Sequence, residues 1–236
     1  MTQERVIAGA ERGTSQHQEN GVSDEPGRRG QIVRAATTVL ARQGYTATSL
    51  KDVAREAGVA PGLLHYYFES KQELLLEVVS GMEREMTQDW QAAIANIEDP
   101  LERIVAALDH TAVRCTERPE FFRLLFDLYN LGLSSPAIRV RCAEMWERFI
   151  DDIEGEVRRL LGRLPAYALL PPRDLAAAVA GAIDGIALSG LVTQRSSREL
   201  YHALKVMLLS LVVTAYVTAG QEPPVARLTE LLARHR

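Results

Sequence analysis

The 236-residue sequence predicts an all-α protein, with a small N-terminal helical domain and a larger C-terminal one. Apolar residues recur at three- and four-residue steps along most of the chain, which is the period of a helix with one buried face. β-Branched residues are sparse and never alternate with polar ones over a long run, so strand signals are nearly absent. The hydrophobic content of 47% and the charged content of 25% are typical of a globular protein rather than a disordered chain.

The N-terminal part divides into a tail and a first helix. Residues 1–26 are rich in Gln, Glu, Ser and Gly and show no sustained apolar period, so we expect a flexible tail. The first helix is predicted to run to about Gln43, with Ile32 and Val39 on its buried face. Gly44 ends it, because glycine suits the left-handed conformation that follows a helix.

Two short amphipathic helices joined by a tight Ala-Gly-Val turn come next. Thr48 is expected to cap the first of them, and Asp52 lies three residues after Ser49, as in a capping box. Gly58 suits a left-handed C-terminal cap, and Pro61 suits the first turn of the following helix. Helices in this arrangement form a helix-turn-helix, in which the first helix crosses the DNA backbone and the second enters the major groove.

The second helix of this motif carries aromatic and polar side chains where a core helix would be apolar. His65 and Tyr66 are left to project outward, whereas Phe68 is assigned to the core. Ser70 is expected to cap a further helix, with Lys71 in its first turn. A cation there opposes the helix dipole, so a phosphate partner would explain Lys71, and a solvated lysine is the alternative.

The motif resembles the DNA-binding domain of the TetR family of transcriptional regulators over about residues 28–75. The resemblance rests on a Thr-initiated helix, Asp-Val-Ala, Ala-Gly-Val, a Gly, a Tyr-Phe pair and Ser-Lys-x-x-Leu. The sequence departs from the family at Ala60, where Ser is usual, and at His65, where Tyr is usual. The resemblance implies phosphate contacts from Thr48, Tyr67 and Lys71 and groove contacts from Pro61, Gly62, Leu63, His65 and Tyr66. Simple packing is the alternative for the tyrosine at position 67 and the glycine at position 62.

The distribution of charge supports a helix-turn-helix DNA-binding domain at residues 27–74. The whole chain has a net charge of −4, but residues 27–73 carry seven basic and only four acidic side chains. Basic charge therefore gathers where a DNA-contacting face needs it. Arg28 and Arg29, just before the first helix, either reach phosphates or the minor groove or stay solvated.

Residues 75–236 are expected to form a helical effector-binding and dimerisation domain, with prolines at several helix starts. The helices predicted after the motif are 71–96, 100–118, 120–129, 136–163, 173–194, 198–219 and 225–233. Helix 173–194 has small residues that allow close helix approach, including Gly181 and Gly185, and helix 198–219 is apolar over most of its circumference. In the resembled family the last two long helices of each subunit form a four-helix dimer bundle. We therefore expect a homodimer through 173–194 and 198–219, the alternative being that both lie inside a monomer core.

The helix predicted at 120–129 is overloaded with aromatic side chains. It forms either an ordinary core or one wall of a pocket for a small apolar or amphipathic effector. Asp184 is an acid within the apolar stretch 176–192, so it either pairs across the interface or points at a ligand. His110 is a candidate too, although it could be an ordinary partly buried histidine. The candidate ligand-binding residues are Trp90, His110, Arg114, Phe122, Leu125, Phe126, Tyr129, Trp146, Phe149 and Asp184.

Other function classes find little support. The sequence has no phosphate loop, nucleophile elbow or Gly-rich dinucleotide turn, and its five histidines show no metal-ligand spacing, so we expect no enzyme, metal or cofactor. Cys115 and Cys142 are expected to be reduced, mostly buried thiols in a cytoplasmic protein. We expect no signal peptide, because the N-terminus is polar, and we expect the apolar run 206–219 to be too short to span a bilayer.

The sequence thus predicts a cytoplasmic homodimer that binds a palindromic double-stranded DNA operator, represses transcription and is released by a small effector. The alternative is a helical ligand carrier or interaction protein whose helix-turn-helix is incidental.

Overall fold

The computed structural model describes residues 26–162 and 171–234, and these form helices with no strand among them. The expected all-α architecture is therefore confirmed, whereas almost all of the predicted tail, residues 1–25, lies outside the described residues. The helices are α1 Pro26–Ala47, α2 Leu50–Glu56, α3 Pro61–Tyr67, α4 Lys71–Ile94, α5 Pro100–Glu117, α6 Pro119–Ser134, α7 Pro136–Leu161, α8 Pro172–Thr193, α9 Arg198–Thr218 and α10 Val225–Arg234.

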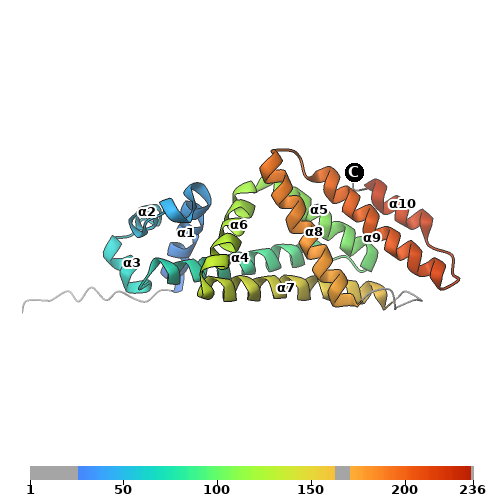
Figure 1. Ribbon diagram of the computed structural model, residues 1–236, viewed down its shortest axis with the longest axis horizontal. Coiled ribbons are helices and arrows are strands. Elements are labelled where there is room, and N and C mark those ends of the chain that lie inside the picture. Colours follow the sequence, from blue (N-terminus) through green and yellow to red (C-terminus); the bar gives the residue numbers. More distant parts are fainter. Residues whose placement is uncertain (1–25, 163–170, 235–236) are drawn as a thin grey trace, which may run out of the picture.

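Helices α1 to α3 form a small head at one end of the molecule (Figure 1). Its core consists of fully buried side chains from each helix and the turn after α3, including Ile32, Val53, Leu64 and Phe68. Gly44 interrupts α1 with a φ of 76°, a backbone conformation that favours glycine, so the regular helix ends where the sequence predicts. The core assignment of the phenylalanine at position 68 is confirmed.

Helix α4 connects the head to the body. Its N-cap is Ser70, whose hydroxyl accepts a hydrogen bond from the Glu73 amide, and its 24 residues extend roughly 36 Å along the body (Figure 1). The buried face of α4 packs against α1 in the head and against α5 and α7 in the body. The same apolar core contains Ile32 of the head and Phe121 and Phe122 of α6, so head and body are packed together.

Helix α6 is longer than the predicted 120–129 segment, because the helix continues to Ser134. Its extra turn packs on α7: a β-carbon added to Gly132 would lie only 3.3 Å from the Arg139 α-carbon. This close packing stabilises the last turn of α6, whose sequence shows little apolar periodicity and therefore did not predict a helix.

Helices α8 and α9 meet near residues 194–197 and diverge from there (Figure 1). By length and composition both are apolar enough to cross a membrane, so the expectation that the 206–219 run is too short does not hold for the whole 21-residue helix α9. The core helix of a soluble protein passes the same test, so this is weak evidence for a membrane span. Only 28% of the apolar window of α8 and 33% of that of α9 is buried within the chain. Large apolar side chains on these helices are exposed, among them Leu188, Val192, Met207, Leu211 and Val217.

Candidate DNA-binding surface and effector pocket

The helix-turn-helix begins with a complete capping box. The Ser49 hydroxyl accepts a hydrogen bond from the Asp52 amide at 3.2 Å, and the Asp52 carboxylate accepts one from the Ser49 amide at 3.0 Å. Ser49, and not Thr48, is therefore the N-cap of α2. The Thr48 side chain is buried and its hydroxyl donates to the Gly44 carbonyl at 2.7 Å, which ties it to the end of α1. A phosphate contact from this hydroxyl would require that bond to break.

The turn and the start of α3 follow the sequence expectations. Gly58 has a φ of 64°, and Pro61 occupies the first turn of α3. Ala60 is the N-cap and has no side-chain oxygen to accept a bond from the helix, which is the structural consequence of the departure noted from the resembled family.

One face of α3 points outward from the head. Pro61, Gly62, His65 and Tyr66 are exposed, and Tyr66 is 66% exposed although it is a large aromatic residue. Their spacing puts them on one side of the helix, while the fully buried Leu64 fixes the opposite side to the core. Two further expected contacts are only partly accessible, because Leu63 and Tyr67 are half-buried. We call Pro61, Gly62, His65 and Tyr66 the exposed ridge of α3, and Leu64 forms its buried base.

The predicted cationic contacts differ in how far the protein already uses them. The Lys71 ammonium donates to the Tyr45 carbonyl and lies 3.9 Å from the centre of the Tyr45 ring, and burial lowers the pKa of Lys71. This contact explains a cation at a helix N-terminus without a phosphate. Arg29 pairs with Glu77 at 2.8 Å, whereas Arg28 is exposed. The sequence could not show this contact, because Tyr45 lies 26 residues before Lys71.

The predicted ligand-binding residues separate into different places. Six of the ten line a pocket enclosed by α4, α5, α6, α7 and α8: Trp90, His110, Arg114, Phe122, Phe149 and Asp184. Phe126, Tyr129 and Trp146 instead line an open groove between α6, α7 and α8, which Asp184 also reaches. Leu125 is fully buried in the core and lines neither space, so it packs in the core and does not make the expected ligand contact. We call the first space the acidic pocket.

Two carboxylates in the acidic pocket have no cationic partner among the described residues. Asp184 on α8 accepts a hydrogen bond from the Tyr129 hydroxyl, and burial raises the pKa of Asp184 to about 7. Asp152 on α7 accepts a bond from the Thr87 hydroxyl at 3.4 Å, and burial also raises the pKa of Asp152. Sequence reasoning missed this second acid, because it looks like any polar residue of an amphipathic helix.

The other charged groups of the pocket are compensated. Arg114 pairs with Asp89 and with Glu85 at 3.2 Å, and its guanidinium stacks 4.9 Å from the centre of the Phe121 ring. Glu83 pairs with Arg148 and approaches Arg141 at 3.7 Å. Burial lowers the pKa of His110, which favours the neutral imidazole, and its Nε2 is buried without a hydrogen-bond partner in the described structure.

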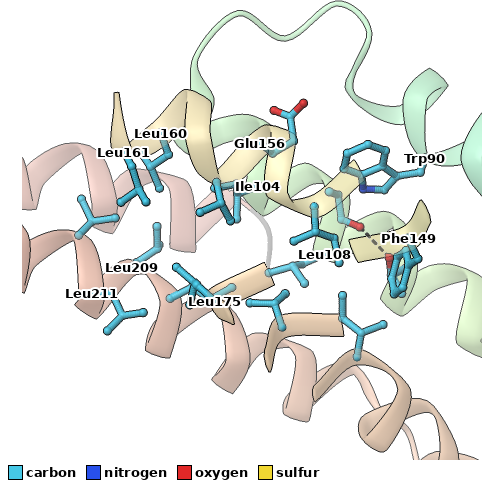
Figure 2. Close-up of a pocket in the computed structure, with 18 of the residues that line it drawn as sticks. Trp90, Ile104, Leu108, Phe149, Glu156, Leu160, Leu161, Leu175, Leu209 and Leu211 are labelled. Atoms are coloured by element: carbon cyan, nitrogen blue, oxygen red, sulfur yellow. Dashed lines mark hydrogen bonds between the residues drawn. The ribbon is translucent and has the colours of Figure 1, made fainter. Parts of the chain in front are cut away.

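A second and larger space, the aliphatic pocket, adjoins the acidic pocket. Figure 2 shows Trp90 and Phe149 at one end of it and Leu160, Leu161 and Leu211 toward the other. Side chains of α5, α7, α8 and α9 form most of its wall. The sequence did not predict it, because apolar residues from four separated helices are individually indistinguishable from core residues.

Neither cysteine suggests reactivity. Cys142 is buried, and Cys115 is half-buried beside the Tyr201 hydroxyl at 3.2 Å. Burial raises the pKa of both thiols, that of Cys115 to about 11, so the nucleophilic thiolate is scarce at neutral pH. Within residues 26–162 and 171–234 no three His, Cys, Asp or Glu side chains group as a metal site would require.

Two family models match the chain in succession. Residues 32–78 match the bacterial regulatory proteins of the tetR family, and residues 100–213 match the C-terminal domain of BetI-type transcriptional repressors. The first match covers most of α1, all of α2 and α3 and the first two turns of α4, and the second runs from the start of α5 into α9.

Curated relatives include two proteins named HTH-type transcriptional regulator BetI. The one from Agrobacterium fabrum is 31% identical over 166 residues, which cover 69% of this chain and 76% of the relative. The one from Rhizobium meliloti is 38% identical over 119 residues, covering 50% of this chain and 58% of the relative.

Solved structures share the fold at lower identity. A transcriptional regulator from Pseudomonas aeruginosa has a TM-score of 0.69 at 17% identity, covering 90% of this chain and 96% of its own. A regulator from Saccharomonospora viridis, solved in complex with choline, has a TM-score of 0.68 at 22% identity, covering 78% of this chain and 96% of its own.

Proposed function

Because this chain belongs to the TetR family of bacterial transcriptional regulators, we propose that it is a homodimeric repressor that a small effector releases from a palindromic operator. Members of this family are regulators and not enzymes, which agrees with the absence of catalytic motifs from the sequence. The observation that carries the proposal is the exposed ridge of α3 on its buried base.

We propose that this ridge enters the major groove. Pro61, Gly62, His65 and Tyr66 are its exposed members and would meet base edges or sugars, with Leu63 at the margin. Arg28 is exposed and hydrogen-bonds only Gln31 of its own helix, at 3.1 Å, so it could turn to a phosphate. Arg29, Thr48, Tyr67 and Lys71 would add phosphate contacts only from partly or wholly buried positions.

Dimerisation is proposed through α8 and α9. Their exposed apolar side chains need cover, and a second copy supplies the same surface in return. Gly181 and Gly185 are exposed on α8, and β-carbons added there would meet no atom within 4 Å, so this face can accept a close helix. Two heads related by a twofold axis would read half-sites about 34–36 Å apart, which motivates a palindromic operator.

The position of the acidic pocket supports the proposed release by an effector. Thr87 and Trp90 of α4 line it, and α4 begins in the head, where Lys71 holds the end of α1. Phe121 and Phe122 line the same pocket and belong to the core shared with the head. An effector that favours a second arrangement by a factor of about 100 supplies roughly 2.7 kcal/mol for the shift.

The chemistry of the acidic pocket favours an organic cation. Asp152 and Asp184 have no cationic partner among the described residues, and Trp90 and Phe149 line the same pocket. The choline bound by the Saccharomonospora viridis protein is a cation of this class, although that likeness supports only the fold.

Selection of DNA from a random duplex pool at moderate salt tests the proposed function. The protein is expected to enrich a palindrome with two half-sites. His65→Ala should then change the preferred base in each half-site, whereas Arg42→Ala, an exposed change on α1, should leave the preference unchanged. Enrichment of no sequence by an intact dimer would refute the proposal. An unchanged preference for the His65 variant would refute only the groove assignment.

A further inference from the structure

The acidic and aliphatic pockets share a wall. Both are lined by Trp90, Thr111, Phe149 and Ile183, which come from α4, α5, α7 and α8. A ligand that occupies both pockets would have to pass between these shared side chains. The two pockets differ sharply in the chemistry that they offer.

The aliphatic pocket has almost no free polar group. The Thr111 hydroxyl donates to the Ala107 carbonyl at 2.9 Å. Glu156 accepts two hydrogen bonds from Arg103, at 2.6 and 2.8 Å, so both of its oxygens are occupied. Nearly all the rest of the lining is leucine, isoleucine, valine and alanine, with the two shared aromatic rings at one end. A charged or hydrogen-bonding ligand group there would lose its hydration without compensation, so a hydrocarbon chain is favoured.

The acidic pocket has the opposite character. Asp152 and Asp184 lack a cationic partner among the described residues, and hydroxyl groups alone donate to them. Arg114 faces the same pocket, but Glu85 and Asp89 already offset its charge. A ligand cation would supply the missing counter-charge, with aromatic faces around it.

We propose that the ligand is a cationic amphiphile, with an ammonium group between Asp152 and Asp184 and an alkyl or acyl chain in the aliphatic pocket. This inference rests on the proposed function, in which the ligand is the effector, and it adds the tail and therefore the chemical class. Each methylene that leaves water adds about 0.8 kcal/mol, or nearly fourfold in affinity. An eight-carbon chain is therefore expected to raise affinity at least about 100-fold, even when only half of it is buried.

The tryptophans provide a direct readout. The sequence has two, and Trp90 lies in the shared wall while Trp146 lies in the open groove. Trp146→Phe leaves Trp90 as the reporter. Its fluorescence is titrated with tetramethylammonium, octyltrimethylammonium, octanoate and octanol, each below its micelle concentration, and calorimetry repeats the titrations on the unmodified protein.

Octyltrimethylammonium is expected to bind at least about 100-fold more tightly than tetramethylammonium and more tightly than octanoate. Asp152→Asn with Asp184→Asn should weaken octyltrimethylammonium at least tenfold and leave octanol unchanged. Ile104→Phe narrows the aliphatic pocket and should weaken both octyl compounds but not tetramethylammonium, whereas Ile186→Phe, outside both pockets, serves as its matched control. The proposal would be overturned if the protein bound tetramethylammonium as tightly as octyltrimethylammonium, or octanoate as tightly as octyltrimethylammonium.

A separate DNA measurement distinguishes this inference from the proposed function. Octyltrimethylammonium that binds at Trp90 but leaves the operator complex intact would support the ligand class and refute release by it. Sequence-specific DNA binding without any binding of the amphiphile would refute the ligand class and leave DNA recognition standing.

Discussion

Replacing Asp184 by Asn is expected to remove a pH-dependent penalty on the stability of the fold. Burial raises the pKa of Asp184 from an ordinary value of 3.8 to about 7, while the unfolded chain ionises near the ordinary value. The folded state therefore holds the proton more tightly, and stability is lost as pH rises between these two values. Each unit of the shift is worth about 1.4 kcal/mol, so the penalty approaches about 4 kcal/mol above neutral pH.

The size of the effect can be worked for two convenient conditions. At pH 5 about 1.6 kcal/mol of the penalty is already present, and at pH 8.5 nearly all of it is, so the difference is roughly 3 kcal/mol. Asn can still accept the hydrogen bond from Tyr129 and never ionises. Relative to the unmodified protein, Asp184→Asn should thus gain roughly 3 kcal/mol between the two conditions.

Urea unfolding at pH 5 and pH 8.5, at one protein concentration, measures this gain. Asp174→Asn is the matched control, because Asp174 is an exposed acid on the same helix α8. A stability difference between the Asp184 variant and the unmodified protein that is the same at both pH values would refute the argument. So would an equal pH dependence in the control.

Three further predictions concern the head and the interface. Ser49→Ala should lower the free energy of unfolding by about 1 kcal/mol in urea melts, because the capping box of α2 is lost. The control Thr46→Ala, at an exposed position, should have little effect, and equal losses for the two variants would contradict the capping role. Gly185→Leu should leave the subunit folded but convert the dimer to monomers in sedimentation experiments, because the side chain would fill the proposed interface. The control Gly155→Leu, on α7, should remain a dimer. A dimer that persists in the Gly185 variant would place the interface elsewhere. Arg28→Ala should weaken binding to all duplexes alike and make the salt dependence shallower by about one unit, because the exposed Arg28 is proposed to contact a phosphate. A selective loss for one sequence would show that Arg28 reads bases.

The order and type of the helices could be predicted because local signals agree with the fold. Gly44, Gly58 and several prolines mark boundaries that depend on backbone conformation and are therefore visible in the sequence. The choice between Thr48 and Ser49 as the cap could not be made in this way. Both residues can cap a helix. The Thr48 hydroxyl instead donates to the carbonyl of Gly44, where the chain leaves the helical conformation, and this contact is visible only in the structure.

The candidate pocket was found in part, and the missing part has a geometric cause. The aromatic residues of α6 predicted that this helix forms a wall of the effector pocket, but only Phe121 and Phe122 in its first turn line the acidic pocket. Later turns of the same helix pass into the core and the open groove. Asp152 and the aliphatic pocket depend on how α5, α7, α8 and α9 are arranged, and such contacts between distant segments leave no local pattern.

The affinity of the intact protein for its selected duplex, compared with a scrambled duplex over a series of salt concentrations, tests the central claim of DNA recognition most directly. We expect the logarithm of the association constant to fall linearly with the logarithm of salt. The selected duplex should bind about a thousandfold or more tightly than the scrambled one at physiological salt. Equal affinity for the two duplexes, or binding that does not respond to salt, would contradict the assignment of α3 as the DNA-reading helix of a dimeric regulator.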